Sequence, residues 1–194
     1  MILSNVAIHQ AIDQGRLRIE PEPHPRVATL EQPDCPYDTT SVDLRLGPRI
    51  SIPRIGPFTY DLSRGGIARF LAENCDHHDL DPVGGYALPR LTLVLGQTLE
   101  SVDLPIPPRV APLAARIEGK SSFARCGLLV HFTAPTVHAG WSGRLTLEMI
   151  NLGNCSITIR PGMKICQLIL EMVEGIPNPN PSQFHGQTTP PGIP

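Results

Sequence analysis

The sequence has few aromatic residues, little excess of either charge and no long uninterrupted apolar run. Its formal net charge of −2 excludes bulk electrostatic attraction to nucleic acid, although a local cationic pocket for a small anion is still compatible with it. No stretch approaches the roughly 18 apolar residues of a transmembrane helix, and residues 1–15 lack the features of a signal peptide. We therefore expect a cytoplasmic protein that binds neither nucleic acid nor membrane.

The cysteines and histidines also lack the spacing of a metal site. The five cysteines are odd in number, and no two of them are spaced as Cys-x-x-Cys, so we expect reduced thiols and no disulfide framework. A zinc deaminase needs His-x-Glu followed by Pro-Cys-x-x-Cys, and neither pattern is present. His131 and His138 have no second ligand at a suitable spacing. No zinc is therefore expected.

Proline is abundant and punctuates the chain. Of the 194 residues 22 are proline, and most lie between apolar runs or near the C-terminus. From Tyr86 onward, short alternating runs each end at glycine, proline or asparagine. Regular short strands with turn signals are typical of a closed barrel or jelly roll. The sequence therefore predicts one mainly β domain over residues 1–175, arranged as a distorted jelly roll or barrel.

Helices are expected to be few and short. Ser4 is a suitable N-cap for a helix over about residues 5–14, and apolar spacing predicts a second helix around residues 67–74. The segment EGKSSFARCG, residues 118–127, favours one or two further helical turns. Residues 176–194 are rich in proline and poor in apolar side chains, so they should form a mobile tail.

The segment GRLTLEMINLG, residues 143–153, has the pattern of a strand with an unusual member. Alternation of period two puts three apolar side chains on one face and a mixed set on the other: Leu145, Leu147 and Met149 against Thr146, Glu148 and Ile150. Glu148 is therefore either a solvated surface carboxylate or a charge held in a cleft for chemistry. The residue pattern alone leaves both interpretations open.

Two further segments carry polar groups suited to a ligand. Lys120 and Arg125 flank Ser121 and Ser122, which are suitable N-cap residues, and a helix start favours anions. That segment is either a phosphate cradle without a Walker motif or a capped turn with two solvated cations. Gln167 lies within an apolar strand and needs a hydrogen-bond partner, which is either structural or a ligand.

Five segments together resemble the dCTP deaminases, which belong to the trimeric dUTPase superfamily. They are SVDLRLG (41–47), TLESVDLP (98–105), EGKSSFARCGLLVH (118–131), GWSGRLTLEMINLGN (140–154) and RPGMKICQLILE (160–171). Their order and spacing fit the family over roughly residues 1–175. The resemblance implies a dUTPase-like barrel or jelly roll with a short N-terminal helix and one or two small helices. It also implies that residues 176–194 act as a lid over the active site.

The resemblance implies a catalytic role for Glu148. In the deaminases this glutamate is the general base that activates water for attack on C4 of cytosine without a metal, whereas dUTPases have an apolar residue there. Bulk water has a pKa near ~15.7, so a carboxylate must accept the proton where no zinc lowers that value. Partial burial between Thr146 and Ile150 should raise the pKa of Glu148. Ser121 and Arg125 are implied to lie near the base and its water.

The resemblance also implies the nucleotide-binding residues. Lys120 and nearby backbone amides would face the triphosphate, and residues 146–148 would line the pyrimidine. The implied set is Lys120, Ser121, Ser122, Phe123, Ala124, Arg125, Ala134, His138, Thr146, Leu147, Gln167, Gln183 and Gln187. Mg²⁺ would be bound through the triphosphate, so no dedicated metal ligand is expected. The implied partners are dCTP as substrate, dTTP as feedback inhibitor, and two further copies of the chain in a homotrimer.

The chain departs from the family pattern at several positions. His138 stands where an aspartate is usual, and the segment QFHGQ has Gln183 for lysine and Phe184 for tyrosine, with Gln187 kept. Three interpretations follow: a dCTP deaminase forming dUTP and ammonia, a dUTPase-like or bifunctional enzyme forming dUMP, and a non-catalytic nucleotide-binding paralogue. His138 counts against the second, because the aspartate is central to pyrophosphate cleavage in that superfamily. Glu148 counts against the third, because a binding protein needs no base at C4.

Overall fold

Short strands make up most of the regular structure in the computed structural model, which describes residues 1–57, 59–180 and 182–193. The tail prediction at Pro181 and Pro194 therefore lies outside the described residues. The helical segments are α1 (Asn5–Asp13), η1 (Leu62–Arg64), α2 (Ile67–Asn74) and α3 (Ser121–Arg125). The strands are β1 (Arg18–Glu20), β2 (Tyr37–Asp38), β3 (Ser41–Arg45), β4 (Arg49–Pro53), β5 (Cys75–Asp79), β6 (Tyr86–Leu88), β7 (Leu93–Asp103), β8 (Leu113–Gly119), β9 (Leu128–Val130), β10 (Thr136–Val137), β11 (Ser142–Asn151), β12 (Ile157–Ile159) and β13 (Lys164–Met172).

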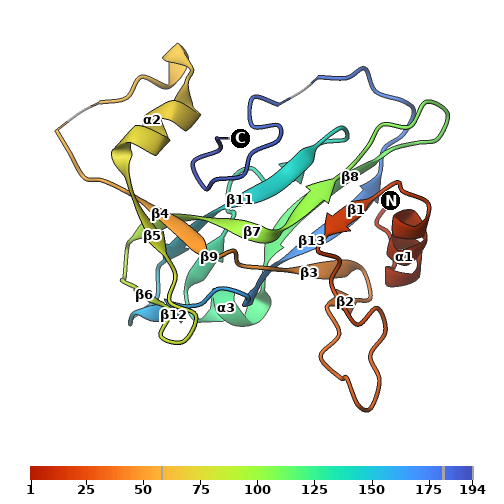
Figure 1. Cartoon of the computed structure of the whole chain (residues 1–194), viewed down its shortest axis with the longest axis horizontal. Helices are drawn as coiled ribbons and strands as arrows, with labels where there is room; N and C mark the ends of the chain where they lie inside the picture. The colour runs from red at the N-terminus through yellow and green to blue at the C-terminus, as the bar shows by residue number, and fades with distance from the viewer. Residues whose placement is uncertain (58, 181, 194) are drawn as a thin grey trace.

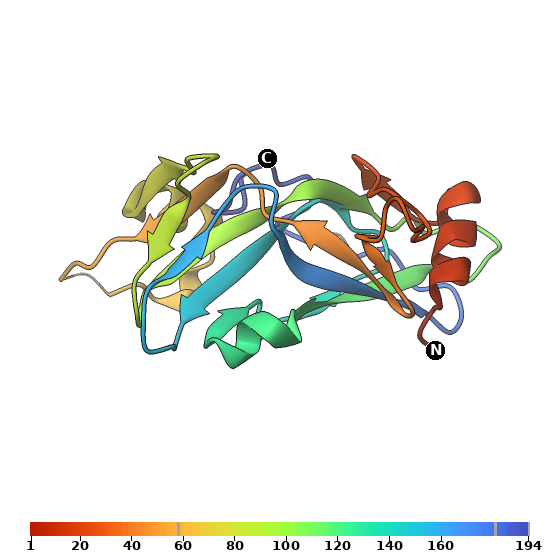
Figure 2. The same ribbon diagram turned by 90° about the horizontal axis from the view of Figure 1, so that it is seen from below.

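Two antiparallel sheets carry the fold. The 6-stranded sheet has the order β5-β4-β7-β11-β9, with β1 also paired to β7, and the 5-stranded sheet has the order β10-β8-β13-β3-β2. The short strands β12 and β6 form a separate pair. Figure 2 shows the strands as a flattened barrel, with α1 at one end of the molecule and α2 at the other. The prediction of a mainly β fold with a short N-terminal helix and small further helices is confirmed.

The boundaries of α1 and α2 agree with the sequence-based predictions, whereas the start of α3 differs from its prediction. Ser4 Oγ accepts a hydrogen bond from the backbone of Ala7 at 3.3 Å and begins α1 as expected. The predicted helix over residues 67–74 is α2. The expectation of a serine N-cap for α3 is wrong: Lys120 is the N-cap and makes no side-chain cap, so both serines lie in the first turn.

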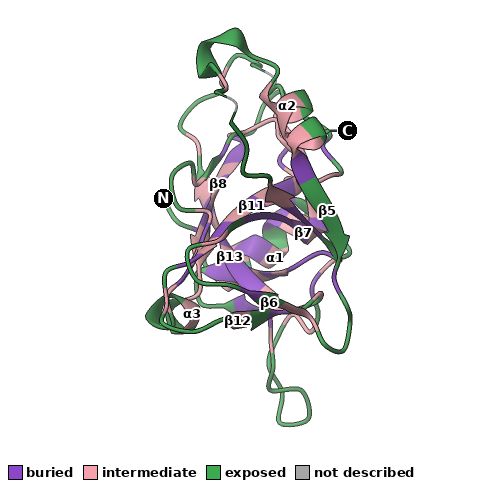
Figure 3. Ribbon diagram, turned by 90° about the vertical axis from the view of Figure 1, so that its left-hand side faces the viewer, coloured by how far each residue is buried: buried purple, intermediate pink, exposed green. Residues whose placement is uncertain are grey.

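The two faces of strand β11 lie in different environments, one in the core and the other toward the surface. Leu147 and Met149 are fully buried in the core between the two sheets, where they lie with Leu113 and Ile117 of β8. Figure 3 shows this buried layer along β7, β8, β11 and β13. Glu148 points to the opposite, partly exposed face, as the alternation predicted. The carboxylate is therefore outside the core, on a face that other segments cover.

The C-terminal tail lies along β11 (Figure 1). Gln187 Nε2 donates to the carbonyl of Arg144 at 2.8 Å, and Thr146 Oγ1 donates to the carbonyl of Pro190 at 3.1 Å. A Cβ at Gly143, which has φ +135°, would lie 3.2 Å from the backbone nitrogen of Gln187, so glycine permits this close approach. Polar and backbone contacts thus connect the described tail residues to β11, although the segment has few apolar side chains; its mobility stays a prediction.

Candidate active site

A cavity of about 770 Å³ lies on the outer face of β11. Its lining comes from α2, the neighbouring strands β7 and β11, the loop that follows β9, and the C-terminal tail. Figure 1 shows α2 and the end of the chain close together on this side of the molecule. The volume lies within the range of pockets that hold small organic ligands.

Glu148 and His131 form a charge contact in this cavity. His131 follows β9, which pairs with β11, and its backbone nitrogen donates to the carbonyl of Glu148 at 2.8 Å. The imidazole Nδ1 lies 2.7 Å from Glu148 Oε2, and the Nε2 lies 2.8 Å from the carbonyl oxygen of Ala134. At this distance the two side chains interact through a short polar contact and, where the imidazole is protonated, through charge attraction. The sheet register therefore places the imidazole of His131 beside the carboxylate.

The contact changes both pKa values in opposite directions. Burial lowers the pKa of His131, but Glu148 and the carbonyls of Ala134 and Thr146 outweigh burial and raise it above the ordinary 6.5. Burial raises the pKa of Glu148, but His131 outweighs burial and lowers it below the ordinary 4.5. The predicted rise for Glu148 is wrong, because burial acts here together with an adjacent imidazolium. Both shifts favour the charged forms, which leave a carboxylate able to accept a proton.

Several predicted binding residues meet Glu148 at this cavity. Ala134, His138, Thr146 and Gln187 all line it. Leu147 is not among the lining residues, because its side chain is fully buried on the core face, and its predicted place along the pyrimidine stays a prediction. Alternation explains the difference, because successive residues of β11 face opposite sides of the sheet.

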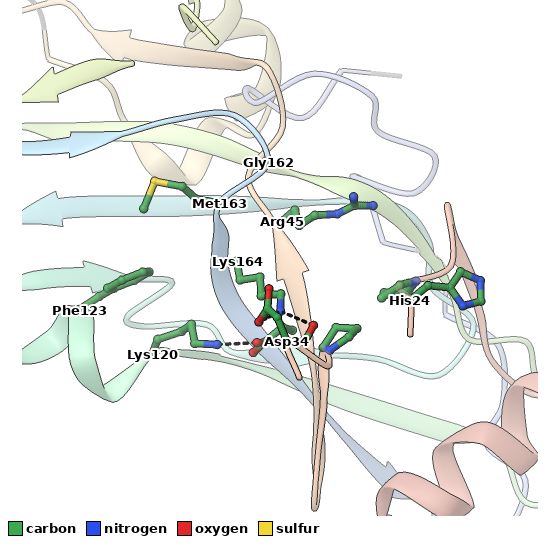
Figure 4. A pocket seen from close by; sticks show the side chains of 11 residues that line it. His24, Asp34, Arg45, Lys120, Phe123, Gly162, Met163 and Lys164 are labelled. Carbon is green, nitrogen blue, oxygen red and sulfur yellow. Dashed lines mark hydrogen bonds and ion pairs between the residues drawn. The ribbon is translucent and has the colours of Figure 1, made fainter. Parts of the chain in front are cut away.

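A second, separate cavity of about 560 Å³ holds Lys120 and Phe123. Lys120 Nζ lies 2.5 Å from Asp43 Oδ2, and Lys164 forms an ion pair with Asp34 in the same cavity. Figure 4 shows both pairs and places Arg45 on the neighbouring strand β3. Lys120, the cation predicted to face the triphosphate, is therefore balanced by a carboxylate within the single chain.

The remaining predicted residues are not brought to the Glu148 cavity by one chain. Four α3 residues are exposed: Ser121, Ser122, Ala124 and Arg125. Gln167 accepts a hydrogen bond from Ser41 Oγ at 3.0 Å on β3, and Gln183 is exposed and absent from the cavity lining. A single chain thus gathers the predicted residues around Glu148 in one cavity, whereas the predicted residues of α3 lie outside that cavity.

Sequence reasoning missed His131 and the α2 residues Ile67 and Leu71, which also line the cavity. His131 lies just beyond a short strand, and only the pairing of Met149 with Val130 reveals that it meets Glu148. Nothing in the local sequence carries that signal.

Within residues 1–57, 59–180 and 182–193, no group of three or more histidine, cysteine or acidic side chains is arranged to hold a metal ion. None of the helices in these ranges is both long and apolar enough to cross a membrane.

Comparison with known proteins gives one consistent family. The model of the family described as "dCTP deaminase-like" matches residues 2–173. A dCTP deaminase from Rhodospirillum rubrum is 35% identical over 88% of this chain and 82% of its own length. A "dCTP deaminase, dUMP-forming" from Corynebacterium glutamicum is 36% identical over 88% of this chain and 80% of its own length.

A solved structure shares the fold. It is the crystal structure of 2'-deoxycytidine 5'-triphosphate deaminase from Agrobacterium tumefaciens, with a TM-score of 0.62 and 22% identity. The match covers 89% of this chain and 48% of that chain, so this chain spans about half of its length. The family match over nearly the whole chain and the identity to its relatives show that the chain belongs to the dCTP deaminase-like family.

Proposed function

We propose that this protein is a dCTP deaminase, which converts dCTP and water to dUTP and ammonia. The observation that carries the proposal is the charged Glu148–His131 contact in a nucleotide-sized cavity. A protein that only bound nucleotides would have no use for a carboxylate held in its basic form at that position. The names of the relatives from Rhodospirillum rubrum and Natronomonas pharaonis support the same substrate.

In the proposed reaction, Glu148 accepts a proton from water as the water oxygen attacks C4 of cytosine. The proton passes to N3, which gives a tetrahedral carbon bearing both hydroxyl and amine. Glu148 then takes the hydroxyl proton and transfers it to the amine, the C4–N4 bond breaks, and ammonia leaves as the C4 carbonyl forms. General acid–base catalysis of this kind contributes roughly 10²–10⁴-fold. His131 keeps Glu148 charged between these transfers.

The proposed active site is shared between copies of the chain in a homotrimer. Support comes from the separation of the two sets of predicted residues, since Arg125 is exposed on α3 and is not among the residues that line the cavity around Glu148. In the assembly, α3 of one copy would bring Ser121 and Arg125 to the cytosine above Glu148 of its neighbour.

The triphosphate would lie toward Lys120 and carry Mg²⁺ on its own oxygens. Asp43 and Asp34 are carboxylates of the kind that Mg²⁺ accepts, but each is already paired with a lysine. This arrangement fits an ion held mainly by phosphate oxygens and water. The tail would close over the base through Gln187, and dTTP would bind the same cavity as a feedback inhibitor.

A second candidate function is formation of dUMP, because relatives with that name are as similar to this chain as the simple deaminases. One product assay separates the candidates. The protein is incubated with dCTP, dCDP, dCMP and dUTP, and ammonia and pyrophosphate are measured separately. Release of ammonia without pyrophosphate supports the dCTP deaminase, and release of both products supports the dUMP-forming enzyme. If the protein releases no ammonia and no pyrophosphate, the catalytic function is contradicted.

A further inference from the structure

Helix α2 has an apolar face that does not belong to the hydrophobic core. Ile67 and Leu71 are one helical turn apart, so they lie on the same face of the helix. Both are half-buried, and neither is among the described side chains that form or pack against the core between the two sheets. Figure 3 shows α2 beside the end of β5, and none of its residues is buried. Both side chains line the cavity around Glu148 instead, so this face of α2 is a wall of the candidate active site.

A row of directly paired residues connects Glu148 to this helix. Glu148 of β11 is paired with Leu95 of β7, which is paired with Ser51 of β4. Ser51 is paired in turn with His77 of β5, and its Oγ lies 2.8 Å from His77 Nδ1. The other ring nitrogen of His77 lies 3.2 Å from the carbonyl oxygen of Ala72 in α2. Directly paired residues share one face of a sheet, so α2 is attached to the face that carries Glu148, on the β4–β5 side of the carboxylate.

The two sides of Glu148 along this row differ in polarity. On the β9 side lies the imidazole of His131, whose Nδ1 is 2.7 Å from Glu148 Oε2. On the β7 side lies Leu95, which is 6% exposed and lines the cavity, and the α2 wall lines the same cavity beyond it. A ligand that lies over Glu148 is therefore met by a polar ring on one side and by apolar side chains on the other.

Cytosine has the same asymmetry about C4. One neighbour of C4 is N3, which accepts a hydrogen bond, and the other is C5, which carries only a hydrogen atom. An acceptor held against an apolar wall without a donor costs free energy, so N3 is disfavoured on the α2 side. With C4 at Glu148, the C5–C6 edge of the ring then faces Leu95 and α2.

We propose that Ile67 and Leu71 contact the C5–C6 edge of the pyrimidine and make the site favour nucleotides with a methyl group at C5. The proposal rests on the proposed function, which places C4 of cytosine at Glu148. A methyl group on C5 would pass from water to an apolar wall, and burial of one methyl group strengthens binding about fourfold. The chemistry at C4 stays the same, so 5-methyl-dCTP and water would give dTTP and ammonia. The substrate class therefore includes 5-methylcytosine nucleotides.

The substitution Leu71→Ala tests the contact, because alanine favours the helix but removes the side chain that would meet the methyl group. Calorimetric binding of dTTP and dUTP compares two nucleotides that differ only in this methyl group. Wild-type protein should bind dTTP about fourfold more tightly than dUTP, whereas the variant should bind the two almost alike. Leu62→Ala, at a position that is 75% exposed, is the matched control and should keep the wild-type ratio. Equal ratios for wild-type protein and Leu71→Ala, or no wild-type preference for the methyl group, overturn the proposal.

Turnover gives a second measurement and separates this proposal from the proposed function. The ratio of kcat/KM for 5-methyl-dCTP to that for dCTP should fall about fourfold in Leu71→Ala and in the same direction in Ile67→Ala. A ratio of two nucleotides on one protein is unaffected if part of that protein is unfolded, so a loss of stability does not mimic the effect. A kcat/KM ratio that neither variant changes overturns the proposal. If wild-type protein releases no ammonia from either nucleotide, the proposed function fails, while the binding ratio of dTTP to dUTP still decides whether α2 contacts the methyl group.

Discussion

Glu148 Oε2 and His131 Nδ1 lie 2.7 Å apart across the β9–β11 pair, and each holds the other in its charged form. The histidine side chain is 12% exposed and the glutamate side chain 38% exposed, so the carboxylate keeps an open side toward the cavity. The base is thus fixed on one side by protein and free on the other, where a water and the pyrimidine would lie.

Glu148→Gln should abolish ammonia release, with a fall of at least roughly 10²-fold, while nucleotide affinity changes little. The amide keeps the shape of the side chain but cannot accept the proton from water. An ammonia assay beside calorimetric binding checks both parts. Glu174→Gln, at an exposed position, is the control. Substantial turnover by the Glu148 variant would show that Glu148 is a solvated surface carboxylate and not the general base.

The His131–Glu148 contact should make stability depend on pH within a defined window. The lowered pKa of Glu148 contributes stability that is present above its ordinary 4.5 and lost as pH falls through the folded value. The raised pKa of His131 contributes stability that is present below its ordinary 6.5 and lost as pH rises through the folded value. The contribution is therefore largest between these two ordinary values.

His131→Asn removes this contribution while keeping a residue that tolerates the positive φ of 55°. Denaturant unfolding should show a loss of about 0.5–1 kcal/mol near pH 5.5, because Glu148 is more than a third exposed and solvent screens the pair. The loss should shrink by pH 8.5. His78→Asn, on an exposed part of β5, serves as control. A loss of equal size at both pH values would argue against the charge contact.

Mixing two inactive variants should restore activity if sites are shared between subunits. Glu148→Gln and Arg125→Ala remove opposite halves of the proposed site, and unfolding and refolding them together allows mixed assemblies. If the two variants assemble at random, roughly a quarter of the shared sites would combine an intact Glu148 from one copy with an intact Arg125 from its neighbour. Light scattering should report about 63 kDa, three times the 21.1 kDa chain. An active monomer, or no recovery in mixed trimers, would place the whole site within one chain.

Incubation with dUTP and Mg²⁺ should yield no dUMP. His138 lines the cavity where the superfamily has a carboxylate, and an imidazole accepts at most one hydrogen bond. It is therefore a poor substitute for an aspartate that orients water toward a phosphate. Chromatography of the nucleotides checks the result. Clear dUMP formation would mean that another residue activates water for that cleavage.

Removal of residues 176–194 should raise KM for dCTP and leave the barrel folded. The tail contributes Gln187 and the carbonyl of Pro190 to the face around Thr146, whereas the core lies between the two sheets. Steady-state kinetics and near-ultraviolet circular dichroism separate the two effects. An unchanged KM would mean that the tail has no role in nucleotide binding.

Local sequence was enough to predict the strand region from Tyr86 onward, α2 and the faces of β11, because these depend on periodicity and turn residues within a few positions. The short strands β1, β2 and β5 carry no such local pattern and were not predicted. The alternation around Glu148 placed the carboxylate outside the core, and several separate motifs gave the family. These features need no knowledge of which distant segments meet.

Only the tertiary structure brought His131 to Glu148, the tail to β11, and Asp43 to Lys120. Each of these contacts joins segments distant in sequence through strand register or backbone hydrogen bonds, which composition and periodicity do not encode. The pKa of Glu148 shows the consequence. Its place on the face away from the core followed from alternation, but the direction of its shift depended on His131, which the fold supplies from the segment after β9.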